Sequence, residues 1–317
     1  MNKFGRFTLS LVLVSVLIFS GCATKKETEQ VTIRFGTLPV LQALDVYVAA
    51  EKGYFDTEKV KVELINFNTA AEKDIALTAG QIDGYFGDLF TPIVVEGNGV
   101  DISIVATNYN TLANRHMFAV LSSPKSNVKS IDQLAGVPVA ISSNSVIHYV
   151  TETLVENGGV TLDEFATMES KNIGLRMQML MSGQIEAATL PEPLVSAAAK
   201  GGATILANDE GIAPSQTVLI FSEKFAKDHP KAVKKFLKAI DKAHNEINTN
   251  PDDVRSVMVE YIRLPEPMKA TYPIPSFPNL SVPDKELVME VVSWLTDKEA
   301  LKKELTYEEL VNGVYLP

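Results

Sequence analysis

The chain has 317 residues and a single cysteine, Cys22, so it forms no internal disulfide. Its longest charge-free apolar run, from Leu9 to Phe19, has eleven residues. A helix that spans a bilayer needs about 20. Basic clusters are also missing, and the net charge is −10. This acidic balance argues against a nucleic-acid partner.

Motifs for catalysis are missing too. The four histidines are widely separated, and none has the His-x-x-x-His spacing of a metal-binding helix. The sequence contains neither a Gly-x-Ser-x-Gly nucleophile elbow nor a Gly-x-x-x-x-Gly-Lys phosphate loop. We therefore expect no metal, no cofactor and no enzymatic activity. An exported enzyme is the less favoured alternative.

What is present begins at the N-terminus, where Lys3 and Arg6 precede the apolar run in the manner of a secretory signal. Ser20-Gly21-Cys22 then resembles a bacterial lipobox, in which the cysteine thiol is lipidated and becomes the new N-terminus. Two acyl chains such as palmitate give a stable anchor, since each buried CH₂ contributes about 0.8 kcal/mol. We expect a lipoprotein signal at 1–22 and lipidation of Cys22. The less favoured alternative is a cysteine without a function at the end of a helix.

The stretch that follows Cys22, ATKKETEQ at 23–30, is polar and free of aromatic residues. It buries too little apolar surface to fold, so it predicts a flexible stalk. Loss of Lys3 and Arg6 on cleavage would change the net charge from −10 to −12. An anionic ligand would then be held by local dipoles and not by the overall field of the protein. The expected location is the outer face of the cytoplasmic membrane or the periplasm.

Two stretches repeat each other at an offset of 103 residues: 77–84 reads LTAGQIDG and 180–187 reads LMSGQIEA. In each half, the pattern predicts strand, helix, strand, helix and strand around this motif, with a less regular third element in the second half. Gly80 and Gly183 stand where a helix commonly ends in a left-handed residue. A common helix–turn–strand joint, without duplication, is the alternative explanation.

Each half predicts a mostly parallel sheet flanked by helices, which gives an α/β fold with two lobes. We expect lobe 1 at 31–118 and 212–317, and lobe 2 at 119–211. Two crossings between lobes form a hinge pair that can close a cleft. Short strands that begin within the repeated motif are predicted at 82–86 and 185–189. One long helix is predicted at 224–248.

Ligands of open α/β sheets bind at the carboxyl ends of the strands, and pockets favour domain interfaces. The loops at these ends therefore supply the candidate ligand-binding residues. They are Leu41, Gln42, Phe67, Asn68, Asp88 and Asn108 in lobe 1, and Ser142, Ser143, Asn144, Ser145, Glu192 and Pro193 in lobe 2.

The polar cluster Ser142–Ser145 directly precedes a predicted helix, and helix N-termini bind anions. Ordinary N-capping is its alternative. Asp88 and Glu192 are expected to accept hydrogen bonds from the ligand, with helix capping and a surface turn as their alternatives. Arg115 and Arg176 are the only candidate cations near these loops, and each is equally compatible with a solvated surface position. Two carboxylates without an obvious arginine favour a ligand with a donor group over a simple inorganic anion.

Several motifs resemble ABC-transporter binding proteins for sulfonates, taurine, nitrate and the thiamine pyrimidine precursor. They are Leu38-Pro39, DVYVAAEKGYF at 45–55, GQIDG at 80–84, IDQLAG at 131–136 and LPEP at 190–193. The resemblance covers most of 31–245. It implies a type II periplasmic-binding-protein fold with hinge closure.

The resemblance also implies delivery of a small organic ligand to a membrane permease with a cytoplasmic ATPase. We expect a monomer with no nucleic-acid partner. An extracytoplasmic ligand sensor with the same fold is the alternative function. The cysteine-rich motif of some thiamine-precursor binders is missing here, which lowers the weight of a pyrimidine ligand.

Overall fold

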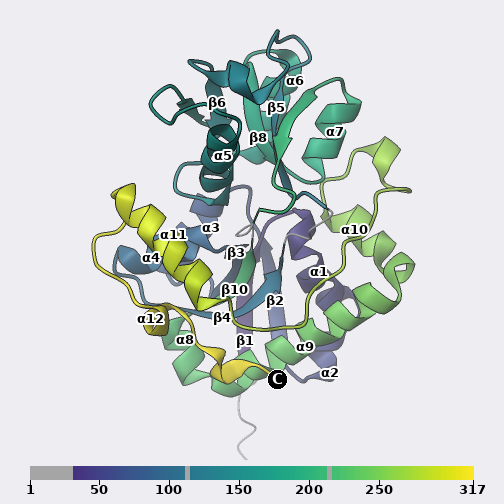
Figure 1. The fold of residues 1–317 in the computed structure, drawn as a ribbon. Coiled ribbons are helices and arrows are strands. Elements are labelled where there is room, and N and C mark those ends of the chain that lie inside the picture. The colour runs from purple at the N-terminus through teal and green to yellow at the C-terminus, as the bar shows by residue number, and fades with distance from the viewer. Residues whose placement is uncertain (1–30, 111–114, 213–215) are drawn as a thin grey trace, which may run out of the picture. The chain divides into compact units, whose positions relative to one another are not determined.

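The computed structural model describes residues 31–110, 115–212 and 216–317. The predicted signal sequence, Cys22 and the stalk lie outside these residues. Within the described ranges, no helix has both the length and the apolar character needed to cross a bilayer. The described chain forms two five-stranded sheets with helices packed around them (Figure 1). We call the part built on the first sheet the first lobe and the part built on the second sheet the second lobe.

The first sheet has the order β2-β1-β3-β10-β4, in which β1 pairs in parallel with β2 and β3. Strand β10 is antiparallel to both of its neighbours, β3 and β4. The bounds are β1 (Thr32–Thr37), β2 (Lys61–Asn66), β3 (Gly84–Asp88), β4 (Ile102–Tyr109) and β10 (Thr217–Ser222).

The second sheet has the order β7-β6-β8-β5-β9, in which β6 pairs in parallel with β7 and β8. Strand β5 is antiparallel to β8 and β9. The bounds are β5 (Phe118–Ser122), β6 (Pro138–Ile141), β7 (Ala166–Glu169), β8 (Ala187–Pro191) and β9 (Thr204–Asn208).

The two sheets have the same plan. In each sheet, three parallel strands lie next to one antiparallel strand, which is β10 in the first sheet and β5 in the second. Each of these antiparallel strands directly follows, in the chain, a strand of the other sheet. Gly80 and Gly183 both have the predicted left-handed conformation, with φ of +66° and +77°. The predicted α/β fold of two helix-flanked sheets is confirmed, and each sheet is mixed.

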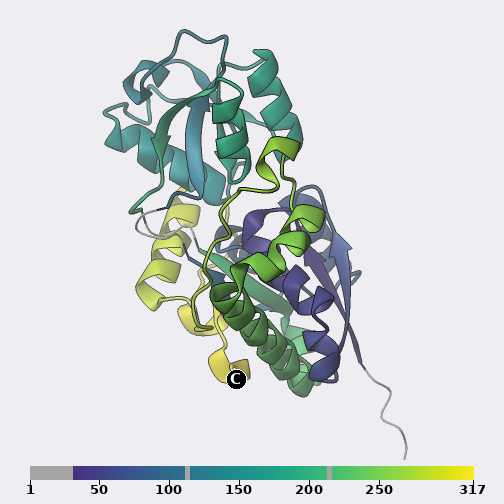
Figure 2. The ribbon, with the colours of Figure 1, turned by 90° about the vertical axis from the view of Figure 1, so that its right-hand side faces the viewer.

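Helices flank both sheets. In the first lobe, the long helix α9 packs across α1 and α2 (Figure 2). The second lobe carries α5, α6 and α7 around its sheet (Figure 1). The bounds are α1 (Leu44–Glu51), α2 (Tyr54–Thr57), α3 (Ala70–Thr78), α4 (Phe90–Gly97), α5 (Val146–Asn157), α6 (Ile173–Ser182), α7 (Leu194–Lys200), α8 (Glu223–Asp228), α9 (Pro230–Thr249), α10 (Arg255–Tyr261), α11 (Lys285–Asp297) and α12 (Tyr307–Leu310).

Three predicted elements have other boundaries in the structure. The short strands begin at Gly84 and Ala187, two residues later than predicted in both halves. In the first lobe, Asp83 directly precedes β3 and still bonds to both neighbouring strands: its N–H donates to the Arg34 carbonyl oxygen at 2.8 Å, and its carbonyl oxygen accepts from the Ser222 N–H at 2.9 Å. The predicted helix 224–248 is split into α8 and α9 at Pro230, which has no N–H for the preceding turn.

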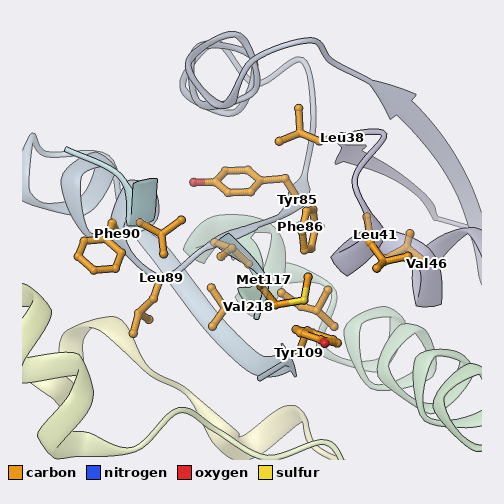
Figure 3. Close-up of a cluster of buried hydrophobic side chains, with 14 of the residues drawn as sticks. Leu38, Leu41, Val46, Tyr85, Phe86, Leu89, Phe90, Tyr109, Met117 and Val218 are labelled. Carbon is orange, nitrogen blue, oxygen red and sulfur yellow. The ribbon is translucent and has the colours of Figure 1, made fainter. Parts of the chain in front are cut away.

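A large buried cluster holds the first lobe together and also includes residues of the second sheet, such as Val139 and Ile141. Figure 3 shows part of it, with Tyr85 and Phe86 from β3 together with Tyr109 and Met117. All four side chains are at most 2% exposed. The aromatic side chains of β3 and β4 are therefore packed in the interior, and few of them are free to reach a ligand.

Candidate ligand-binding cleft

A cavity with an empty volume of about 620 Å³ lies at the carboxyl ends of strands from both sheets. Asp88 ends β3 and Pro191 ends β8, while Leu38 and Ser142 directly follow β1 and β6. All four residues line this cavity, which we call the cleft. Strand tips of both lobes therefore meet around one space.

Two further cavities adjoin this region. One, of about 630 Å³, shares Ala70 and Lys171 with the cleft and extends along the Ser142–Ser145 loop, including Ser143 and Asn144. The other, of about 360 Å³, is lined by residues that include Asn68, Glu192, Pro193 and Arg263.

Arg176 is the main cation that the second lobe gives to the cleft. It lies on α6, is 0% exposed, and its Nη2 donates to Ser142 Oγ at 3.2 Å. Its Nε and Nη1 have no hydrogen-bond partner among the residues that the structure describes. Burial lowers the pKa of this guanidinium to about 10, and Glu169 offsets only part of that effect. The alternative of a solvated Arg176 is wrong.

Lys73 is the corresponding cation of the first lobe. It lies on α3, lines the cleft and is 0% exposed. Its Nζ lies 4.2 Å from the centroid of the Tyr85 ring and has no hydrogen-bond partner within the described ranges. Burial lowers the pKa of the ammonium group, against the opposing charges of Asp74 and Asp88. Two buried cations with unbonded N–H groups thus line one cavity. A buried charge is costly unless it is paired.

Sequence reasoning missed Lys73. A signal was available, because Lys73, Ala76 and Leu77 share one face of α3 at i, i+3 and i+4, and this face is buried. A lysine on the apolar face of a helix that leads into a cleft requires an explanation. The expectation that two carboxylates without an obvious arginine favour a donor-bearing ligand over a simple inorganic anion is not supported by this geometry.

The Ser142–Ser145 loop lies where the sequence placed it, before α5, but it does not cap the helix in the ordinary way. Ser145 makes no side-chain capping bond, and its hydroxyl donates to the Ser142 carbonyl oxygen at 2.8 Å. Asn144 has φ of +55°, and its N–H donates to His148 Nδ1 at 3.3 Å. Ser143 N–H donates to Glu169 at 3.0 Å.

Asp88 lines the cleft and also caps a helix. Its Oδ1 accepts hydrogen bonds from the N–H groups of Phe90 and Thr91, at 2.9 and 2.8 Å. Burial raises the pKa of this carboxyl, and the bond from Thr91 opposes the shift. One oxygen of Asp88 is therefore committed to α4. Gln42, also in the cleft wall, has a buried Oε1 without a partner in the described part of the chain.

Glu192 is 3% exposed and has internal partners. Its carboxylate accepts from Ser196 Oγ at 2.8 Å and from Ser196 N at 3.2 Å, and it forms an ion pair with His116 Nε2 at 2.9 Å. Burial alone would raise its pKa, but the bonds from His116 and Ser196 lower it below the usual value. Asn68 accepts from Arg263 at 2.7 Å. These contacts leave little capacity for a ligand donor.

Three other candidates lie away from the cavities described above. Leu41 and Asn108 are both 0% exposed. Asn108 Nδ2 donates to the Gln42 carbonyl oxygen at 2.9 Å, and Asn108 Oδ1 accepts from Thr217, so this amide supports the cleft wall from behind. Phe67 packs against the large buried cluster.

A family model described as NMT1/THI5 like matches residues 41–254, which is more than half of the chain. The chain belongs to the NMT1/THI5-like family. Among curated proteins, it is 25% identical over 253 residues to one described as an aliphatic sulfonates-binding protein of Bacillus subtilis, covering 74% of this chain and 72% of that protein.

Solved structures agree with this NMT1/THI5-like assignment. The alkanesulfonate-binding protein SsuA of Xanthomonas axonopodis pv. citri, bound to MOPS, has a TM-score of 0.76 at 18% identity, over 89% of this chain and 98% of that one. The nitrate-binding protein NrtA of Synechocystis PCC 6803 has a TM-score of 0.72 at 13% identity, over 90% and 87%.

These likenesses confirm the two-lobed periplasmic-binding-protein fold and the superfamily inferred from the sequence motifs. They also support the prediction that this member of the family is a binding protein of a transporter and not an enzyme.

Proposed function

We propose that this chain is the solute-binding lipoprotein of an ABC importer and that it captures a small organic anion in the cleft. A lipid at Cys22 holds it at the outer face of the cytoplasmic membrane. Its partners are the importer's permease and ATPase. The sulfonate- and nitrate-binding relatives support an acidic ligand.

The observation that carries the ligand class is the pair of buried cations, Lys73 and Arg176, which line the same cavity and have N–H groups without a partner in the described residues. An oxyanion that accepts from Arg176 would satisfy a guanidinium that the protein itself leaves incompletely bonded. Much of the remaining lining is apolar, including Phe86, Phe118 and Val146. This lining favours an organic acid over nitrate, because nitrate has no apolar part to bury.

A thermal-shift screen tests this function. Alkanesulfonates, taurine, nitrate, carboxylic acids and uncharged pyrimidines are compared at equal concentration. A ligand at 100 times its Kd adds about 2.7 kcal/mol of stability, which raises the melting temperature by about 5 °C or more. We expect this increase from organic acids and not from pyrimidines. Stabilisation by uncharged heterocycles alone would contradict the assignment.

The anchor is tested separately with Cys22→Ser. Wild-type protein in a bacterial host is expected in the membrane fraction and to incorporate a palmitate analogue, because acyl chains partition into the bilayer. The Cys22→Ser protein is expected to incorporate none. Equal labelling of the two proteins would show that the lipid is not on Cys22.

A further inference from the structure

Lys73 and Arg176 are equivalent residues of the internal repeat. They are separated by 103 positions, the same offset as the Gly-Gln-Ile motifs. Each is the fourth residue of its helix, α3 or α6, and each stands four positions before a buried leucine, Leu77 or Leu180. Both residues line the cleft, so each lobe contributes one cation from an equivalent position of the repeat.

The cleft carries excess positive charge. Its charged lining residues are three cations and one carboxylate: Lys73, Lys171, Arg176 and Asp88. No ion pair to Lys73 or Arg176 is present in the described residues, and one oxygen of Asp88 is held by two N–H groups of α4. Asp74 and Glu169 offset part of this charge through their effects on Lys73 and Arg176. Each lobe nevertheless presents a buried cation with unbonded N–H groups, and an acidic group placed against each cation would satisfy it.

Both cations are seated deep in their own lobes. Lys73 Nζ lies 3.1 Å from where a Cβ on Gly87 would stand, so the ammonium group rests against the backbone of β3. Arg176 bonds to Ser142, at the end of β6. Apolar residues contributed by both lobes line much of the space that they share: Leu38, Val40, Phe86, Phe118, Val146, Ile147, Ile173 and Pro191.

We infer that the ligand is a small organic diacid, with a sulfonate or carboxylate group at each end of a short apolar spacer. One acidic group pairs with Arg176 of the second lobe and the other with Lys73 of the first lobe. This inference rests on the proposed function, because it names the class of anion that the cleft takes.

Isothermal titration with matched acids tests the inference. The probes are propane-1-sulfonate, 3-sulfopropanoate and propane-1,3-disulfonate, which share a short chain and differ in the second acidic group. We expect wild-type protein to bind at least one diacid about 30-fold more tightly than propane-1-sulfonate, because a charge-assisted hydrogen bond is added. Lys73→Met is expected to remove this advantage, so that the three acids bind the variant with similar affinities.

Three outcomes would overturn the inference. Equal wild-type affinity for the monosulfonate and both diacids would do so, and this comparison needs no variant. Equal weakening of all three acids by Lys73→Met would show that a single oxyanion contacts both cations. If none of these acids and no other organic acid binds, the proposed function fails and the diacid with it. The melting temperature of ligand-free Lys73→Met checks that this variant is folded.

Discussion

Arg176→Met will leave the ligand-free protein folded and at least as stable as the wild type, yet lower its affinity for the best acid of the thermal screen by about 100-fold. The two effects have opposite directions because Arg176 is buried with two nitrogens unsatisfied within the described chain. Removing an unpaired buried charge relieves a desolvation cost in the empty protein. Removing it from the complex leaves the ligand's acid without its partner.

Calorimetric titration and thermal melts of the same samples measure both effects. Arg255→Met is the matched control, because its guanidinium bonds to Tyr272 and Asp252, and Arg255 does not line any of the cavities described here. Arg176→Lys keeps the charge and loses the planar fork, so its affinity should lie between those of wild type and Arg176→Met. Unchanged affinity in Arg176→Met, combined with a large loss of stability, would show that this arginine is structural.

Glu152→Gln is expected to destabilise the protein by about 3 kcal/mol at neutral pH, the usual order for breaking a buried ion pair. Glu152 lies on α5, is 7% exposed, and joins the second lobe to α11. Its carboxylate accepts from Trp294 Nε1 at 3.0 Å and from Lys298 Nζ at 2.5 Å, and it contacts His148 Nε2 at 3.1 Å. One substitution therefore weakens three contacts, two of which cross between the lobes.

Ionisation of the Glu152 carboxyl predicts that the stability of the protein depends on pH. Burial would raise the pKa of Glu152, but the bonds from His148, Lys298 and Trp294 outweigh burial and lower the pKa to about 2, from an ordinary value of 4.5. Its stabilising contribution is therefore complete above about pH 4.5 and is lost as the pH falls toward 2. The stability difference between wild type and Glu152→Gln should shrink over this interval.

Urea denaturation between pH 2 and 7 tests this expectation. Glu308→Gln is the matched control, since Glu308 forms an ion pair with Lys285 in which both side chains are exposed, and such pairs contribute little. We expect no measurable change for that variant. A Glu152→Gln deficit that stays constant down to pH 2 would mean that the carboxylate charge is not what stabilises the contact between α5 and α11.

The architecture could be predicted from the sequence because it depends on the periodicity of apolar residues and on the positions of glycines. The repeated Gly-Gln-Ile motif places Gly80 and Gly183 at helix ends, and both are left-handed in the structure. The order of strands and helices in each lobe follows from that pattern. Strand ends were harder to predict, because they depend on pairing between distant residues, such as Asp83 with Arg34 and Ser222, that no local pattern reveals.

The cleft was only partly accessible for the same reason. Loops after strands could be located, which placed Gln42, Asp88 and the Ser142–Ser145 loop around the cavities. Whether a polar side chain in such a loop is free depends on its partners. Glu192 is bonded to Ser196 and paired with His116, while Asn108 is bonded to Thr217. Lys73 lies on a helix and not in a loop, so a search restricted to loops did not reach it.

The place of β10 has a consequence for how the chain assembles. All five strands of the second sheet lie within one continuous stretch, from Phe118 to Asn208, so that sheet can form from its own segment. The first sheet is interrupted until β10 arrives, because β10 separates β3 from β4 and pairs Asp88 with Thr217. Pairings between such distant segments slow folding. The second lobe should therefore reach its native structure early, and the first lobe should be completed last.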